Sequence, residues 1–238
     1  QDRESRGSMA NKPCAIALVA INEWMGLVVR VRYLTLLGMT IGSLMRGVEI
    51  GNITYEAVTR VILDGMLRVY PDGMSLAQFK DVGNLFKSWA EVQYAADNAP
   101  LYLLRSSTED SSKVSDVSGA FFLYSVSEGK RLPIIHDPAL VFGEESSQLM
   151  PYPFSDGGLE DLLRQEQQSV NRIACGFAAA SFQLAPGEKR RIDTYAGFTP
   201  TADLLASQLP LMSSSGFAQA KSLESDHLCG ALLDDVDT

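Results

Sequence analysis

Cysteine is scarce in this chain of 238 residues, which contains only Cys14, Cys175 and Cys229. The three thiols lie far apart in the sequence and none belongs to a CxxC pair. They cannot build the disulfide framework that stabilises small secreted domains. We therefore predict buried, reduced thiols and a reducing, cytoplasmic location.

Histidine is scarcer still, with only His136 and His227. Because the two are widely separated, no metal centre is predicted, and each is interpreted as a packed side chain. The chain also lacks a Walker loop, a GxGxxG turn after a strand, a GxSxG nucleophile elbow and an HExxH motif. No metal and no cofactor are predicted.

Positive charge is in short supply as well. Lys and Arg together number 20, Asp and Glu number 29, and the formal net charge is −9. Nucleic-acid binding requires a basic surface that neutralises phosphates, so this class of function is not expected.

Long apolar runs are also missing. The most apolar N-terminal run, residues 14–21, has eight residues, whereas roughly 20 are needed to cross a bilayer. We predict neither a membrane segment nor a signal peptide. The polar start of the chain, with Gly-Ser-Met at residues 7–9, predicts a disordered or tag-like N-terminus over residues 1–13.

Apolar segments that alternate with polar residues dominate residues 14–199. In residues 27–37, Val29, Val31 and Tyr33 fall on one face of an extended chain, which is the period of a sheet strand. The same reasoning predicts strands at residues 14–21, 90–94, 101–105, 120–126, 132–136, 139–142, 173–184 and 190–198. The last two are expected to form a hairpin across the turn at residues 185–188.

Residues 56–70 are ambiguous between a helix and a strand. β-Branched residues are dense there, Gly65 interrupts the segment, and the turn residues 70–73 close it. These features favour a strand. Residues 106–118 and 143–158 have the composition of loops.

Helical periodicity is confined to four segments, residues 75–89, 159–168, 201–212 and 217–236. Strands therefore come first and helices last along the chain. This order predicts a mainly β fold: an antiparallel β super-sandwich over residues 14–199 with a short helical insert. Residues 200–238 are expected to form a helical linker toward a further domain.

Few residues are candidates for chemistry. The paired acids Glu109-Asp110, Glu144-Glu145 and Asp234-Asp235 are interpreted as exposed loop acids, and no residue is assigned a catalytic role. The acidic loop 108–116 lacks the glycine and the alternation of an EF-hand. Four aromatic residues are compatible with stacking on sugar, with core packing as the alternative: Trp24, Trp89, Tyr94 and Tyr102.

Several short segments resemble a known family. They include residues 27–32, 36–38, 64–66, 70–74, 88–92, 105–110, 119–123, 137–138, 141–143 and 184–188, together with Arg46, Asn52 and Gly216-Phe217. They are similar to the N-terminal β super-sandwich of glycoside hydrolase family 94 enzymes, and most similar to 1,2-β-oligoglucan phosphorylases. The resemblance spans roughly residues 27–238.

The resemblance implies a super-sandwich and a linker helix that precede an (α/α)6 barrel, with the general acid supplied by that barrel. No catalytic residue is carried over onto this sequence. The leading hypothesis is a non-catalytic part of a β-glucan phosphorylase that supports the sugar site, with a catalytic barrel in cis or in trans, a homodimer contact and β-glucan as partners. The alternatives are an inactive relative that serves as a structural subunit of a larger assembly, and a carbohydrate-binding module.

Overall fold

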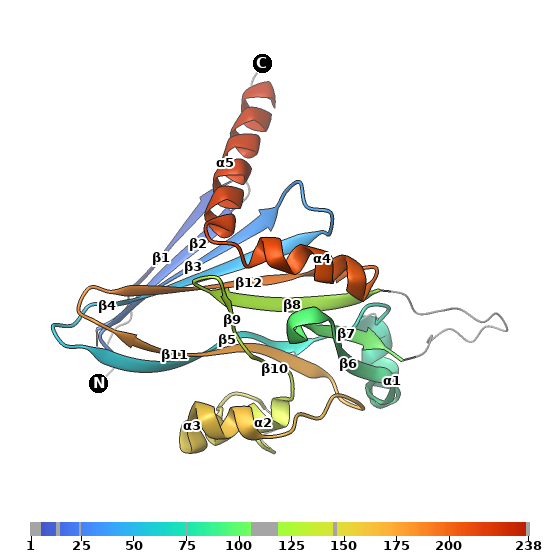
Figure 1. Ribbon diagram of the computed structural model, residues 1–238. Coiled ribbons are helices and arrows are strands. Elements are labelled where there is room, and N and C mark those ends of the chain that lie inside the picture. The colour runs from blue at the N-terminus through green and yellow to red at the C-terminus, as the bar shows by residue number, and fades with distance from the viewer. Residues whose placement is uncertain are drawn as a thin grey trace.

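Two antiparallel sheets of unequal size face each other in the computed structural model (Figure 1), which describes residues 6–12, 15–23, 25–74, 76–105, 119–144 and 147–236. The larger sheet has nine strands, in the order β1-β2-β3-β4-β12-β8-β7-β6 with β9 paired to β8. Its members are β1 (Arg6–Lys12), β2 (Ala15–Asn22), β3 (Leu27–Leu36), β4 (Ser43–Asn52), β6 (Ala90–Tyr94), β7 (Pro100–Leu104), β8 (Ala120–Ser127), β9 (Lys130–Arg131) and β12 (Lys189–Thr199). The smaller sheet has three strands, β10 (Ile134–Ile135), β11 (Ala174–Leu184) and β5 (Val58–Val69).

Helices cover both outer faces of the sandwich and one of its ends (Figure 1). They are α1 (Leu76–Trp89), the 3-10 turn η1 (Ala96–Asn98), α2 (Pro138–Phe142), α3 (Tyr152–Arg164), α4 (Ala202–Met212) and α5 (Phe217–Val236). The helix α4 lies on the larger sheet, and α2 and α3 lie beneath the smaller one. Within the described residues, no helix combines the length and the apolar character that crossing a bilayer requires.

Strand alternation distributes apolar side chains between two cores. On β3, Leu34 and Leu36 point to the layer that contains α4, whereas Leu27, Val29 and Val31 point to the smaller sheet. Successive side chains of a strand face opposite sides of the sheet, so a strand covered on both sides needs apolar residues at odd and even positions. The structure confirms the predicted mainly β sandwich and the strand over residues 56–70, as β5.

The first strand departs from the expectation of a disordered or tag-like segment. Residues 6–12 form β1, which pairs with β2 from Arg6 opposite Ile21 to Lys12 opposite Ala15. A strand at the edge of a sheet needs only backbone N–H and C=O groups for its ladder. Polar composition alone therefore does not exclude it.

The predicted hairpin between residues 173–184 and 190–198 is wrong. The two strands form as β11 and β12, but β11 pairs with β5 and β10, whereas β12 pairs with β4 and β8. The turn between them carries the chain from one sheet to the other. Turn residues are required at such a corner and in a hairpin alike, so the local sequence does not distinguish the two.

Two helices occur where the sequence predicted a strand and a loop. Residues 139–142 belong to α2, which begins after Asp137, whose Oδ1 accepts a hydrogen bond from the backbone N–H of Ala139 at 2.9 Å. The Asp-Pro pair is a helix-start signal that outweighs the short apolar run. Likewise α3 begins at Tyr152 rather than Leu159, and it bends at Gly158.

Candidate functional site

The four aromatic residues predicted to face sugar do not form one platform. Trp24 lies outside the described residues. Tyr102 on β7 is 1% exposed, and its hydroxyl donates to the backbone oxygen of Cys175 at 3.1 Å. A ring buried in this way presents no face to a ligand, because β7 lies inside the larger sheet and is covered on both sides.

The other two rings lie at opposite ends of β6. Trp89 ends α1, is partly buried, and meets the edge of Phe86 at a centroid distance of 5.7 Å. Tyr94 ends β6 and is 46% exposed. Five extended residues span roughly 16 Å, so these rings do not share one sugar-sized surface.

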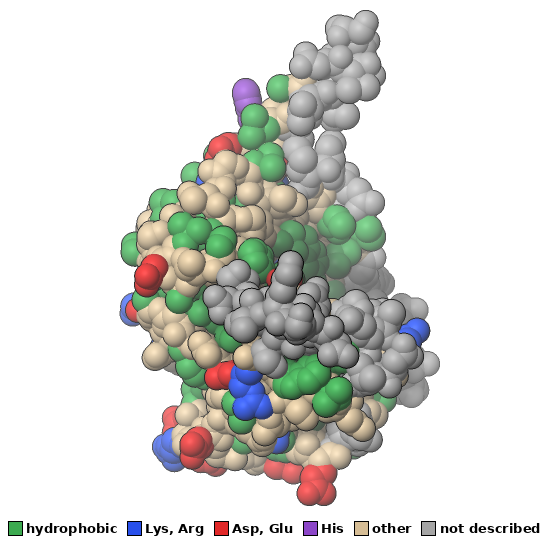
Figure 2. Space-filling view, turned by 90° about the vertical axis from the view of Figure 1, so that its right-hand side faces the viewer, with side chains coloured by type: hydrophobic (Ala, Val, Ile, Leu, Met, Phe, Trp, Pro, Cys, Tyr) green, Lys and Arg blue, Asp and Glu red, His purple; other side chains and the backbone are tan. Residues whose placement is uncertain are grey.

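Other groups singled out in the sequence are distributed as follows. The loop 106–118, with Glu109, Asp110 and Asp116, and the side chains of Cys14, Cys229, Asp234 and Asp235 lie outside the described residues. Cys175 is buried, and burial raises the pKa of its thiol. His227 is exposed on α5, where Figure 2 shows a histidine at the surface, so its interpretation as a packed residue is wrong. The described residues contain no group of three or more His, Cys, Asp or Glu arranged to hold a metal ion.

Asn52, which is followed by Ile53 and Thr54, has a structural role. Its side chain is buried at 2% exposure, and its Nδ2 donates to the backbone oxygens of Glu56 at 2.8 Å and Leu184 at 3.1 Å. Its Oδ1 accepts from the backbone N–H of Thr54 at 2.8 Å. The amide therefore ties the end of β4 to the end of β11.

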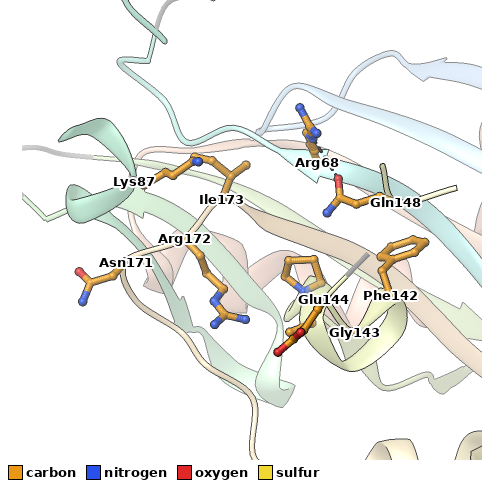
Figure 3. Close-up of a pocket in the computed structure, with 11 residues that line it drawn as sticks. Arg68, Lys87, Phe142, Gly143, Glu144, Gln148, Asn171, Arg172 and Ile173 are labelled. Atoms are coloured by element: carbon orange, nitrogen blue, oxygen red, sulfur yellow. Dashed lines mark hydrogen bonds between the residues drawn. The ribbon is translucent and has the colours of Figure 1, made fainter. Parts of the chain in front are cut away.

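A cavity of about 430 Å³ lies between the end of α1, strand β5, helix α2 and the segment before β11 (Figure 3). Its polar lining comes from four different parts of the chain: Arg68, Lys87, Glu144, Gln148, Asn171 and Arg172. Its apolar lining is Pro138, Ala139, Phe142 and Ile173. Ligand sites in proteins commonly have this size and this mixture of apolar walls and a few polar groups.

Among the described lining residues, three side chains are cations and one is an acid. Nε of Arg68 donates a hydrogen bond to Oε1 of Gln148 at 3.1 Å. Nζ of Lys87 lies 3.4 Å from Oδ1 of Asn84. No acidic side chain of the described residues forms an ion pair with either of these two cations. In a chain of net charge −9, this cavity carries the opposite local sign.

The third cation is held in place by buried groups. Arg172 pairs with Oδ1 of Asp137, whose side chain is only 6% exposed, and also donates to Oε1 of Gln168. Oδ2 of Asp137 accepts from the backbone N–H of Gln168 at 2.9 Å. A carboxylate fixed by these contacts orients the guanidinium before any ligand arrives.

Next to this network lies His136, which is fully buried. Its Nδ1 is 3.0 Å from the hydroxyl of Tyr94, and its Nε2 is 3.3 Å from Oγ of Ser169. Burial lowers its pKa to about 4, while Asp137 acts in the opposite direction. The imidazole is therefore neutral at pH 7 and serves as a hydrogen-bonded core residue.

The lowered pKa of His136 predicts acid sensitivity. The unfolded chain binds a proton near pH 6.5 and the folded chain only near pH 4, so stability is lost as pH falls from 6.5 to 4. This one group contributes up to roughly 3 kcal/mol to that loss. Urea unfolding of the original protein and of His136→Asn at pH 7, 6, 5 and 4 checks this prediction. The free energy of unfolding of the variant should depend less steeply on pH.

The exposed His227 supplies the control for this experiment. We expect His227→Asn to retain the full pH dependence of the original protein, because His227 is exposed on α5 whereas His136 is enclosed. An unchanged slope in His136→Asn would refute the assignment to His136.

The cationic residues of the cavity could not be identified from the sequence. Arg68, Lys87 and Arg172 belong to a strand, a helix and a connecting segment that are remote in sequence. The only local signal was the Asp137-Pro138 pair, which marks a helix start and here also anchors Arg172.

No protein-family model matches the chain, and no curated protein matches it in sequence. Among solved structures, a polysaccharide lyase matches 88% of this chain with a TM-score of 0.38 and 10% sequence identity. The chain spans 27% of the length of that lyase. At this identity and TM-score, the similarity assigns neither a family nor an activity.

Proposed function

We propose that the chain is the β-sandwich module of a carbohydrate-active enzyme of the β-glucan phosphorylase type. Its role is to hold and orient a separate helical catalytic domain, in cis or in trans, while that domain supplies the chemistry. The carrying observation is the helix α5, which is fastened to the larger sheet at its base and then projects away from the sandwich (Figure 1).

The base of α5 is fixed by apolar and polar contacts. Phe217 and Ala218 are 7% exposed and join the core under α4. Nζ of Lys221 donates to the backbone oxygen of Leu37 at 2.9 Å, and Arg32 on β3 pairs with Asp226 at 3.1 Å. These contacts give the helix a defined direction instead of a free hinge.

Apolar side chains on the same helix are left in solvent. Leu223 is 64% exposed and Leu228 is 40% exposed. Figure 2 shows apolar side chains at the surface beside the base of the projecting helix. Exposed leucines on a helix whose base is held in place indicate a site where another domain packs. Burial of these side chains would stabilise that contact by the hydrophobic effect.

The sugar-related part of the proposal is supported by the family resemblance of the sequence and by the sandwich with its linker helices. An inverting phosphorylase needs one acid on the enzyme and phosphate as the nucleophile. In the proposal this acid lies on the helical domain. β-Glucan as substrate and a homodimer contact are part of the same proposal.

Replacing the exposed leucines of α5 tests this function. The native protein that carries this sandwich, purified with any partner chain that it binds, should release glucose 1-phosphate from β-1,2-glucooligosaccharides and phosphate. Replacing both leucines, Leu223→Asp with Leu228→Asp, should lower this rate by about tenfold or more, since truncating central apolar contacts commonly costs more than 1 kcal/mol.

Leu163→Asp is the matched control, because Leu163 is 41% exposed on α3, on the other side of the sandwich. It should leave the rate within about twofold, a change below roughly 0.5 kcal/mol. Lack of phosphorolytic activity in the native protein together with any copurifying chain, or an activity that the double leucine variant does not lower, would refute the proposal. An inactive polypeptide that still assembles would favour a structural subunit.

A further inference from the structure

We propose that the cavity between α1, α2 and β5 binds a monosaccharide-sized ligand that carries one anionic group, a phosphate or a carboxylate. The cavity is lined by elements at the end and lower side of the sandwich in Figure 1, away from the projecting α5. The inference is therefore independent of the function proposed for α5.

Charge is the first argument. Arg68 and Lys87 reach the cavity from β5 and from the last turn of α1, and neither forms an ion pair with an acid of the described residues. Cations that lack a protein counter-ion attract an anion from solution, and a concave wall strengthens the interaction by reducing screening. The remaining donors of the Arg68 guanidinium match the oxygens of a phosphate or carboxylate.

Preorganisation is the second argument. Asp137 and Gln168 hold the guanidinium of Arg172, and Gln148 holds Nε of Arg68. Two of the lining residues also adopt the left-handed backbone region, Gln148 at φ 54° and Asn171 at φ 63°. Left-handed non-glycine residues occur where the surrounding structure requires a particular backbone direction, and they cluster at ligand sites.

Size and the remaining lining specify the rest of the ligand. About 430 Å³ accommodates a monosaccharide with one substituent. Pro138, Phe142 and Ile173 provide an apolar wall for the C–H face of a sugar ring. Glu144, the one acid among the described lining residues, can accept a hydrogen bond from a hydroxyl group and repels a second anionic group.

Figure 3 shows that the lining groups come from separate elements around one space. Lys87 comes from α1, Arg68 from β5, Arg172 from the segment before β11, and Glu144 from the end of α2. A ligand seated there would contact all four elements. The anionic group is expected at Arg68 and Lys87, the two lining cations that form no ion pair with an acid of the described residues, and a hydroxyl group is expected at Glu144.

Calorimetric titration with glucose 1-phosphate, glucuronate, glucose and inorganic phosphate tests the inference. We expect at least one anionic sugar to bind, more weakly as salt is added. Glucose and inorganic phosphate should each bind about tenfold more weakly or worse, a difference of about 1.4 kcal/mol. The tighter of the two anionic sugars identifies the anionic group.

Charge-removing variants locate the site. Arg68→Met with Lys87→Met should weaken binding of the anionic sugar at least tenfold, and Lys87→Gln alone, at an exposed position, serves if the double variant does not fold. Arg164→Met, at a 72% exposed side chain on α3, and the Leu223→Asp, Leu228→Asp variant should bind normally. Absence of binding at millimolar concentration, equal binding of glucose or of phosphate alone, or undiminished binding in the cavity variants would overturn the inference.

Discussion

Gly65→Ala is expected to unfold the sandwich or to destabilise it by more than about 3 kcal/mol, since overpacking against an immovable neighbour exceeds the usual range for core insertions. A Cβ at Gly65 would lie 1.8 Å from the carbonyl oxygen of Gly176 and 2.8 Å from Cα of Phe177. Both atoms belong to the backbone of β11, which pairs with β5 along most of its length. The clash cannot be relieved by a change of rotamer, only by separating the two strands.

Gly42→Ala is the matched control, because a Cβ at Gly42 would meet no heavy atom of the described residues within 4 Å, apart from its own residue and chain neighbours, and its φ is not in the left-handed region. It should change the free energy of unfolding by less than about 0.5 kcal/mol. Urea unfolding followed by circular dichroism measures both variants. A Gly65→Ala protein with near-original stability would show that β5 and β11 do not approach as closely as described.

Asp64→Ala is the second substitution with a large expected effect. Asp64 on β5 accepts from Arg46 on β4, with Nε 3.1 Å from Oδ2 and Nη2 2.5 Å from Oδ1. This ion pair joins the two sheets inside the sandwich, with side chains that are 8% and 24% exposed. Arg46 also donates to the hydroxyl of Tyr33 and lies 5.2 Å from the centre of its ring.

Removing one partner leaves the other charge in a poorly hydrated position. Breaking a buried pair in this way typically costs 3–5 kcal/mol, and the partial exposure of Arg46 places the expected loss near the lower end, about 3 kcal/mol. The paired replacement Arg46→Met with Asp64→Leu should recover a large part of the loss, because it removes both charges and keeps apolar volume. A double-mutant cycle on urea unfolding measures the coupling.

The exposed pair between Arg164 and Glu160 on α3 is the control for this cycle. Its side chains are 72% and 87% exposed and 3.2 Å apart. Glu160→Ala should change stability by less than about 1 kcal/mol. A comparably small effect of Asp64→Ala would contradict the assignment of the cross-sheet pair to the stability of the sandwich.

Much of the local structure could be predicted from the sequence. The alternation around Val29 and Val31 predicted β3, and the spacing of Leu204, Leu205 and Leu209 predicted α4. Such patterns are readable because side-chain periodicity follows directly from backbone geometry. Even the ambiguous residues 56–70 were resolved correctly from their β-branched content.

The candidate site could not be predicted in the same way. Trp89, Tyr94 and Tyr102 were grouped by residue type. In the structure, Trp89 and Tyr94 lie at opposite ends of strand β6, and Tyr102 is buried in the core. The cavity instead depends on Arg68, Lys87 and Arg172, whose positions carry no shared local pattern. Proximity between residues remote in sequence is set by strand pairing and layer packing, which a single sequence does not encode in any short window.

By itself, the sequence determined where most strands and helices lie, and that strands precede helices, because these depend on neighbours along the chain. Only the tertiary structure decided that β11 belongs to the smaller sheet and does not pair with β12. It further decided that Asp64 forms an ion pair with Arg46 across the sandwich. It also decided the close approach that makes Gly65 necessary. These contacts join distant segments, so their energies become apparent only when the whole chain has packed.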